Sequence, residues 1–184
     1  MVIAVFAGNE SPEEVAEKYI YADLNFDYET MQKYRATDLD ISYSFIAMLS
    51  PEPVSEAEIR RRVETELPRL RADNIERMKN EFGSDYKITV TAITTSYVSR
   101  TEMRDKVYAF LSVQIGHIAM TNFVPFELYE GYVPSLIERH MPPLEEIEEM
   151  CIVGARRTVE GSKKRDSWIQ EVLCVKIGGK WKVL

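Results

Sequence analysis

The last third of the chain constrains the fold most strongly, because it contains two turn signals between strand-forming runs. Residues 161–164 separate the runs 151–159 and 168–177, and Gly178-Gly179 leads into the final run. A glycine pair between apolar runs is a strong hairpin signal, because tight hairpin turns need positive φ angles. The pattern therefore predicts a long β-hairpin followed by a short return strand at the end of the chain.

The turn also predicts the register of this hairpin when its centre is placed between Ser162 and Lys163. Arg157 then lies opposite Trp168, which is a favoured pairing of a cation with an aromatic ring. A shift by an odd number of residues would turn apolar side chains toward the wrong face. The predicted opposite pairs are Arg157–Trp168, Val153–Val172, Cys151–Cys174, Glu149–Lys176, Ile152–Leu173 and Met150–Val175.

This register places the two cysteines of the chain, Cys151 and Cys174, directly opposite each other. Two cysteines are too few for a disulfide framework or a cysteine-based zinc site. Opposed Cβ atoms lie about 4.5–5.5 Å apart and a disulfide needs about 3.5–4.5 Å, so a bond requires local adjustment. An oxidising compartment would sustain the bond, and a reducing one would leave two thiols packed as small hydrophobes.

The length and the net charge of the chain limit the classes of protein to which it can belong. The 184 residues correspond to one domain, which we place at residues 11–184 behind an apolar tail at residues 1–10. A net charge of −7 argues against nucleic-acid partners, which normally need a basic surface. The apolar runs are all shorter than the roughly 18 residues of a transmembrane helix, so no transmembrane segment is predicted.

The apolar tail has two interpretations. Val5 and Ala7 occupy positions typical of a signal-peptidase site, but the basic region and the full apolar stretch of a secretory signal are incomplete. We favour the remnant of an export signal over a short strand that packs on the body. This interpretation favours an extracellular or cell-surface location over the cytoplasm.

Two helices are expected near the N-terminus. Ser11 fits the N-cap, Pro12 the first helical position and Glu14 the third, which together form a capping box. Apolar residues at helical spacing extend this helix into the low twenties of the numbering. Asp27 then caps a second helix, which we expect to end near Tyr34.

A longer helix is expected from Ser55, an N-cap, to Phe82, where Gly83 provides a C-terminal stop. Pro68 should kink or split this helix, because proline removes one hydrogen bond and clashes with the preceding turn. The run Arg60-Arg61-Arg62 is flanked by acidic residues, so we interpret it as a solvated helix face.

Two long strands are expected next, over residues 86–100 and 104–120. The alternation in the first changes phase near Ala92, which indicates a β-bulge. The second carries apolar or aromatic residues on both faces, so one face is left for a partner copy and we expect a homodimer. Residues 38–49 are ambiguous, with a short strand as one option, and a short helix is expected from Ser135.

Three segments carry a resemblance to a known superfamily: residues 11–20, residues 27–31 and the closing Gly-Gly-Lys-Trp-Lys-Val at residues 178–183. Their order resembles the nuclear transport factor 2-like superfamily, which has a cystatin-like fold, and in particular its often exported bacterial members. The resemblance implies an α+β fold in which N-terminal helices pack on a strongly curved antiparallel sheet and form a cone with an internal cavity. The long helix and the proline-rich segment after Met120 exceed the compact core of this superfamily.

Members of this superfamily include binding domains and enzymes, such as ketosteroid isomerase and scytalone dehydratase, so the fold cannot choose between these functions. Our first hypothesis is a non-enzymatic domain that binds a small amphipathic molecule or a protein partner. Buried tyrosine hydroxyls need hydrogen-bond partners and would suit a ligand with an apolar body and polar ends. The residues expected to line the cavity are Tyr19, Tyr97, Tyr108, Phe110 and Trp168.

The alternative is a cone-fold isomerase, dehydratase or hydrolase that uses His117 with Tyr108. The chain has two histidines, and we expect His117 to be structural and His140 to lie at the surface. No metal site and no cofactor are predicted, because a metal would need further ligands that the sequence does not identify. The carboxylates Asp105 and Glu171 are expected to face water.

The hairpin tip is the most concentrated positive region of the chain. A basic patch can bind an anionic partner, but a solvated hairpin end is the simpler interpretation in an acidic protein. Its basic residues are Arg156, Arg157, Lys163, Lys164 and Arg165.

Overall fold

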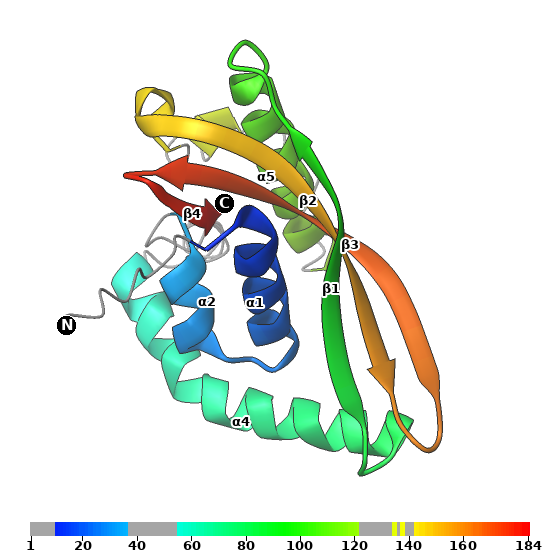
Figure 1. Cartoon of the computed structure of the whole chain (residues 1–184). Coiled ribbons are helices and arrows are strands. Elements are labelled where there is room, and N and C mark those ends of the chain that lie inside the picture. Colours follow the sequence, from blue (N-terminus) through cyan, green and yellow to red (C-terminus); the bar gives the residue numbers. More distant parts are fainter. Residues whose placement is uncertain (1–9, 37–54, 122–133, 136, 139–141) are drawn as a thin grey trace, which may run out of the picture.

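The computed structural model describes residues 10–36, 55–121, 134–135, 137–138 and 142–184 (Figure 1). The predictions for the N-terminal tail, for residues 38–49 and for His140 lie outside these residues. The elements in chain order are α1 (Pro12–Leu24), α2 (Tyr28–Tyr34), α4 (Glu56–Phe82), β1 (Lys87–Tyr97), α5 (Met103–Thr121), the 3-10 turn η1 (Leu144–Glu146), β2 (Ile147–Glu160), β3 (Arg165–Ile177) and β4 (Lys180–Val183).

Four antiparallel strands form one open sheet in the order β1-β2-β3-β4. The β2–β3 hairpin has the predicted register, with all six expected pairs in place. Gly178 and Gly179 have φ angles of 57° and 74° and turn the chain into β4, as predicted. The expected bulge is also present, since the β1–β2 register shifts between Ala92 and Thr94. Together with the helices, this sheet confirms an α+β fold.

The start of α1 follows the predicted capping box. The Ser11 side chain accepts from the Glu14 amide at 3.2 Å, and the Glu14 carboxylate accepts from the Ser11 amide at 2.9 Å. Asp27 caps α2 by accepting from the Thr30 amide at 3.2 Å. These local bonds explain why both helices begin where the sequence predicts.

Helix α5 occupies the segment for which a strand over residues 104–120 was predicted, so that prediction is wrong. Met103, Val107 and Leu111 are buried against the sheet and lie four residues apart, which places them on one face of a helix. Val113 would share a face with Val107 in a strand, but it is 72% exposed. The buried residues therefore follow the helical period.

This helix also removes the reason for expecting a homodimer. That expectation rested on a two-stranded hairpin with apolar residues on both faces. In the structure β1 is followed by α5, which packs one of its faces against the sheet. Dimerisation stays a prediction, without its original support.

Helices cover both faces of the part of the sheet drawn uppermost in Figure 1. α1 packs on the face that carries Val153 and Val172, which we call the inner face. α5 packs on the opposite, outer face, against Met150 and Leu173. α2 lies beside α1 and β4. The apolar core therefore lies on both sides of a single sheet.

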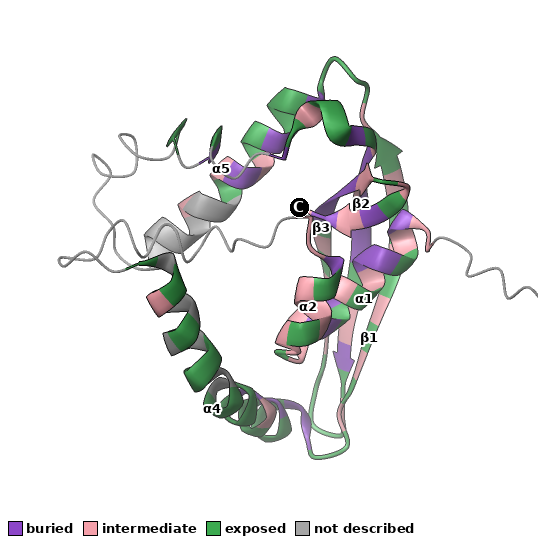
Figure 2. Cartoon of the chain, turned by 90° about the vertical axis from the view of Figure 1, so that its left-hand side faces the viewer, coloured by how far each residue is buried: buried purple, intermediate pink, exposed green. Residues whose placement is uncertain are grey.

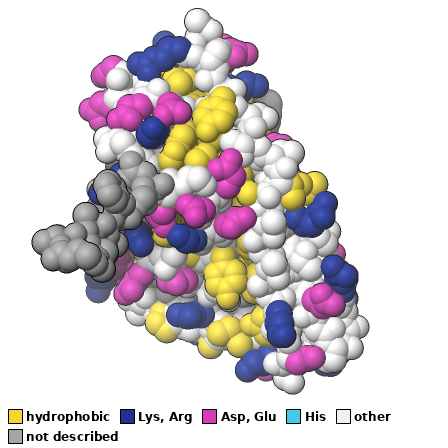
Figure 3. Space-filling view, in the orientation of Figure 1, with side chains coloured by type: hydrophobic (Ala, Val, Ile, Leu, Met, Phe, Trp, Pro, Cys, Tyr) yellow, Lys and Arg dark blue, Asp and Glu magenta, His cyan; other side chains and the backbone are white. Residues whose placement is uncertain are grey.

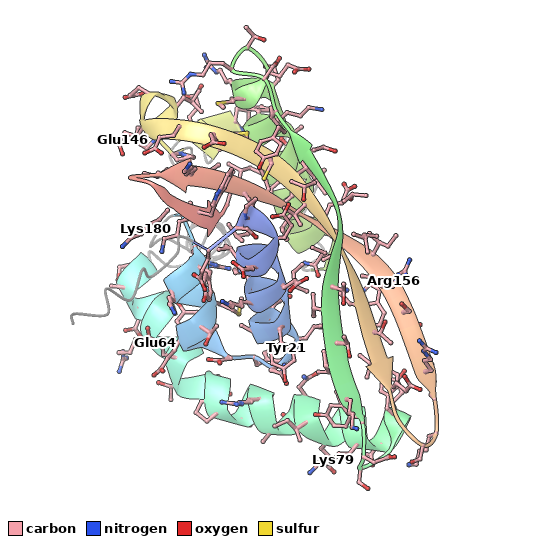
Figure 4. The ribbon with its side chains drawn as sticks, viewed as in Figure 1. Tyr21, Glu64, Lys79, Glu146, Arg156 and Lys180 are labelled. Atoms are coloured by element: carbon pink, nitrogen blue, oxygen red, sulfur yellow. The ribbon has the colours of Figure 1, made fainter. Side chains whose placement is uncertain are left out.

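α4 is one continuous helix that includes Pro68. Figure 4 shows it running in one direction at Glu64 and in another at Lys79, so a bend lies between these residues and agrees with the kink expected from proline. Much of the helix is exposed (Figure 2). Its last turns meet the end of the sheet, where Met78 and Phe82 are buried.

The tip of the β2–β3 hairpin, residues 161–164, is bonded to the C-terminal end of α4. The Lys163 amide donates to the Phe82 carbonyl at 3.0 Å, and the Lys163 ammonium donates to the Asn80 carbonyl at 3.1 Å. The last carbonyls of a helix have no partners within the helix, and they carry the negative end of its dipole. The hairpin tip therefore caps α4.

Side chains reinforce the contact between the hairpin tip and α4. Lys164 forms an ion pair with Glu81 at 2.9 Å, and Ser162 Oγ donates to Asp85 Oδ1 at 2.8 Å. The four residues 161–164 remain at least partly exposed. Of the basic residues predicted at a solvated hairpin end, Arg156, Lys163, Lys164 and Arg165 are exposed, whereas Arg157 is partly buried. The hairpin tip also acts as a helix cap, which was not predicted.

Among the described helices, none is long and apolar enough to cross a membrane. Residues 134–135 and 137–138 are helical, where a short helix was expected from Ser135.

Candidate functional site

Polar and aromatic side chains gather on the inner face beside the apolar core. Side chains alternate along a strand, so Arg157 of β2 and Trp168 and Gln170 of β3 share the inner face with the residues that α1 covers. Asp23 lies one helical turn after Tyr19, so both project from the same side of α1. We call the following residues the inner-face cluster: Tyr19, Asp23, Arg35, Arg157, Trp168 and Gln170.

Two atoms of the inner-face cluster are buried and have no hydrogen-bond partner within the described parts of the chain. They are the donor Nε of Arg157 and the acceptor Oε1 of Gln170, and a third such atom, Gln32 Nε2, lies on α2. Buried polar groups in folded proteins are nearly always hydrogen-bonded, and an unpaired one costs about 1–3 kcal/mol. An unmet donor and an unmet acceptor in one cluster therefore make it a candidate site for a polar molecule or an ordered water.

The guanidinium of Arg157 lies over the indole of Trp168, with Cζ 4.5 Å from the ring centroid. Burial lowers the pKa of Arg157, and the charge of Asp23 opposes this shift. An arginine remains charged in proteins, so the cluster contains a partly buried cation. Its ring contact orients the planar group and leaves the edge that carries Nε for another acceptor.

Asp23 is the carboxyl group of the inner-face cluster, and its shifted pKa is relevant to acid–base chemistry at this site. Burial raises the pKa of Asp23, and the charges of Arg157 and Arg35 oppose the shift. Both arginines act on Asp23 through their charge rather than through a hydrogen bond. Carboxyl groups with a pKa raised by burial beside specific charges are concentrated at functional sites.

The raised pKa of Asp23 predicts a change in stability with pH. A carboxyl with a higher pKa in the folded state contributes stability that is complete below the unfolded pKa and is lost as the pH rises through the folded pKa. We therefore expect Asp23→Asn to be more stable than the wild type at neutral pH, and the difference to vanish below the ordinary value of 3.8. Urea denaturation across this pH range measures the difference.

Glu171→Gln is the matched control, because Glu171 is exposed on β3. Its removal should leave the pH dependence of the wild type unchanged. An Asp23→Asn variant with the pH dependence of the wild type would contradict the assignment of this dependence to Asp23.

The C-terminal ends of α1 and α2 and an interior turn of α4 meet near the inner-face cluster. Arg35, the C-cap of α2, donates to Tyr19 Oη at 3.4 Å. Asn74 of α4 donates to the carbonyl of Leu24 at 3.2 Å, and Arg77 donates to Asn74 Oδ1 at 2.7 Å. These bonds hold the end of α1 between α2 and α4.

The residues of the inner-face cluster are partly exposed, whereas Arg157 Nε and Gln170 Oε1 themselves are buried. Trp168 packs on one side against the apolar residues that α4 and β1 bring to the end of the sheet. A bound molecule would therefore meet an aromatic surface and unpaired polar atoms together. The partly buried residues are Tyr19, Asp23, Arg35, Arg157, Trp168 and Gln170.

A second candidate is an open pocket of about 500 Å³ lined mainly by α1 and α2 around Tyr21. Figure 3 shows this side of the molecule, where acidic and basic side chains alternate over the helices. Polar groups of the pocket already have partners: Glu17 accepts from the Ala92 amide at 2.7 Å, and Thr30 Oγ1 donates to Asp27 at 2.8 Å. We favour the inner-face cluster, because Arg157 Nε and Gln170 Oε1 have no hydrogen-bond partner among the described residues.

The five residues that were predicted to line a cavity lie in different parts of the structure. Tyr19 and Trp168 belong to the inner-face cluster. Tyr97 is 64% exposed on β1, and Tyr108 is 40% exposed on α5. Phe110 packs with α5 against the outer face. The five residues therefore do not form one lining.

His117, the base of the enzyme alternative, lies in α5 rather than in a strand, and its side chain is outside the described residues. α5 packs on the outer face, whereas the cluster lies on the inner face. Asp105 and Glu171 are exposed, as predicted. In the described ranges, no group of three or more His, Cys, Asp or Glu residues could hold a metal ion.

Sequence reasoning missed Asp23, Arg35 and Gln170 as site residues, and it treated Arg157 as a cross-strand partner of Trp168 and as part of the basic tip but not as a site residue. A signal was available for three of them. Arg157 and Gln170 interrupt rows of apolar residues that face inward, and Asp23 lies on the apolar side of α1. A polar residue at a position that the period assigns to the core indicates either a partner or a site. The neighbouring Arg156 shows the contrast, since it projects from the other face of the sheet (Figure 4).

Cys151 and Cys174 are free thiols with no exposed surface, opposite each other beneath α1. Cys174 Sγ donates to the Pro12 carbonyl at 3.8 Å. The hydrogen bond with Cys151, followed by burial, raises the pKa of Cys174. The thiolate is the reactive form of cysteine, so this pair is expected to be unreactive in the folded protein.

We expect a thiol reagent to modify neither cysteine in the native protein and both after unfolding without reductant. Cys174→Ser should leave one reactive thiol after unfolding. Absence of any reactive thiol in the unfolded wild type would reveal a disulfide and contradict the free pair.

Comparison of the chain with protein-family models, with curated proteins and with solved structures found no match.

Proposed function

We propose that this protein is a binding domain for a small amphipathic molecule, which it holds at the inner-face cluster. The observation that carries the proposal is the pair of unpaired buried atoms, Arg157 Nε and Gln170 Oε1, beside a partly exposed Trp168. Ligand sites commonly combine apolar and aromatic surface with a few convergent polar groups. The inner-face cluster has this composition.

Each side chain has a role in the proposal. Trp168 offers the aromatic surface for the apolar body of the ligand. Arg157 donates to a polar head group, and Gln170 accepts from the same head group or from a water that bridges to it. Tyr19 and Arg35 border the site on the side of α2.

The proposed membership of the nuclear transport factor 2-like superfamily rests on the sequence resemblance. The order of the elements supports it, since two N-terminal helices precede an antiparallel sheet that ends in β4. α5 occupies the segment in which the alternation of apolar residues predicted a strand. A cone with an internal cavity remains part of the proposal.

The alternative proposal is an isomerase, dehydratase or hydrolase. One observation favours it: burial raises the pKa of Asp23, and Tyr19 lies one helical turn away. A carboxyl with a raised pKa beside a hydroxyl donor is suited to general acid–base catalysis. Asp23 and Tyr19 would then replace His117 and Tyr108 as the reacting pair.

Tryptophan fluorescence tests the binding proposal with three probes that share one apolar body: octanoate, octanamide and octylammonium. We expect at least one of them to change the emission saturably. The change should persist in Trp181→Phe, because Trp181 belongs to a different buried cluster, and should disappear in Trp168→Phe. Absence of a saturable change with all three probes would contradict the proposal.

A further inference from the structure

The charges of the inner-face cluster define the kind of head group that it can neutralise. Arg35 and Arg157 are cations, and Asp23 is an anion when it is ionised. Tyr19, Trp168 and Gln170 carry no charge. The cluster therefore has a net charge of about one positive unit with Asp23 ionised and about two with Asp23 protonated, so in either state it favours an anionic head group.

The geometry of Arg157 favours a planar anion. Its guanidinium is stacked on the Trp168 ring, and its Nε donor is buried without a partner among the described residues. A guanidinium binds a carboxylate through two parallel N–H donors along one edge. The Nε edge of Arg157 is available for such a contact.

Asp23 is the group that competes with a ligand anion for Arg157. The charged groups that act on Asp23 are Arg157 of β2 and Arg35 of α2, and Tyr19 lies one helical turn before it on α1. On the α4 side, Arg77 is bonded to Asn74, which contacts the end of α1. A ligand anion beside Arg157 would be repelled by an ionised Asp23 and not by a protonated one.

We infer that the inner-face cluster binds the carboxylate of a small acid with an apolar body, and that Arg157 holds this carboxylate along its Nε edge while Asp23 competes with it. This inference rests on the proposed function and adds the head group to it. Binding then weakens as the pH rises through the titration of Asp23. When the ligand carboxylate binds beside Arg157, the Asp23 carboxylate takes up one proton from solvent, and no other bond forms or breaks.

Calorimetric titration with octanoate and octanamide tests the inference, because these probes differ only in their head groups. We expect the wild type to bind octanoate at least about tenfold more tightly than octanamide, as one charge-assisted contact would give. Arg157→Met should remove this preference. Arg165→Met is the matched control, because Arg165 is exposed on the same hairpin and pairs with Glu160 at 3.7 Å.

The pH dependence of octanoate binding is compared between the wild type and Asp23→Asn, a variant that lacks the competing charge. Octanoate affinity of the wild type should fall as the pH rises through the titration of Asp23, whose pKa burial raises, and the affinity of the variant should not show this fall. Thermal unfolding of each variant verifies that it is folded. Arg157→Lys, which keeps the charge without the planar fork, should give an intermediate loss of octanoate affinity.

The outcomes separate this inference from the proposed function. Equal affinity for octanoate and octanamide in the wild type, or unchanged octanoate binding in Arg157→Met, would overturn the carboxylate inference and leave the binding function standing. Absence of binding by both probes, together with an unchanged Trp168 signal for all three head groups, would overturn both.

Discussion

Replacing Val107 by aspartate is expected to lower the free energy of unfolding by about 4 kcal/mol, a large part of the total stability of a domain of this size. Val107 has no exposed surface on α5 and packs among the apolar residues of the outer face, including Met150 and Leu173. An aspartate there would place an unpaired charge in an apolar environment, which costs several kcal/mol. Chemical denaturation followed by circular dichroism measures the loss.

Val113→Asp is the matched control, because it makes the same change on the same helix. Val113 is 72% exposed, so we expect its substitution to change the stability by no more than about 0.5 kcal/mol. A strand over this segment would place both valines on one face and make the two substitutions similarly damaging. Equal losses of stability would contradict the assignment of α5 as a helix.

The second large effect is expected at Gly161 in the hairpin tip. A Cβ atom there would lie 2.2 Å from the carbonyl oxygen of Phe82 and 2.9 Å from its carbonyl carbon. These are backbone atoms of α4, so the contact is relieved only by moving the hairpin tip away from the helix. We expect Gly161→Ala to cost about 3 kcal/mol, the upper end of the range for overpacking.

Gly179→Ala provides the comparison for Gly161→Ala. Gly179 has a φ angle of 74° and no neighbouring atom within 4 Å of an added Cβ, so its cost should come only from the backbone conformation. That cost is about 1 kcal/mol. If Gly161→Ala proves no more destabilising than Gly179→Ala in urea denaturation, the hairpin tip does not dock on α4 as described.

The hairpin could be predicted in detail because its signals are local. Gly178 and Gly179 adopt the positive φ angles that such turns need, and the turn length sets the register of β2 against β3. Once the register is set, Cys151 must face Cys174. The helix caps at Ser11 and Asp27 are equally local and were predicted for the same reason.

α5 could not be distinguished from a strand by its apolar pattern alone. Val107 and Leu111 are four residues apart, which is two strand periods and about one helical turn. The helical and the strand pattern differ only in whether Ala109 and Val113 are exposed, and this exposure depends on the tertiary fold. One local signal was overlooked: Ser99 and Glu102 have the Ser-x-x-Glu spacing of a capping box, although in the structure Ser99 Oγ donates to the Glu102 carboxylate and α5 begins at Met103.

The candidate site was only partly predictable for a similar reason. Tyr19 and Trp168 were expected to bind ligand as aromatic residues, but the same argument selected Tyr97 and Tyr108, which are exposed elsewhere. The distinguishing features of the site are a charged residue, Arg157, on an inward-facing row and its place near Asp23. Arg157 lies near Asp23 because of the angle at which α1 packs on the sheet, and that angle cannot be predicted from the sequence.

Titration of isotope-labelled protein with octanoate, followed by the NMR signals of the Trp168 indole N–H and the Arg157 Nε–H, tests the central claim most directly. These two groups lie together in the inner-face cluster, and the Arg157 donor lacks a partner in the described structure. The account predicts saturable shifts of both signals with one common dissociation constant. Shifts confined to Tyr21 and its neighbours in the open pocket between α1 and α2, with both cluster signals unchanged, would contradict it.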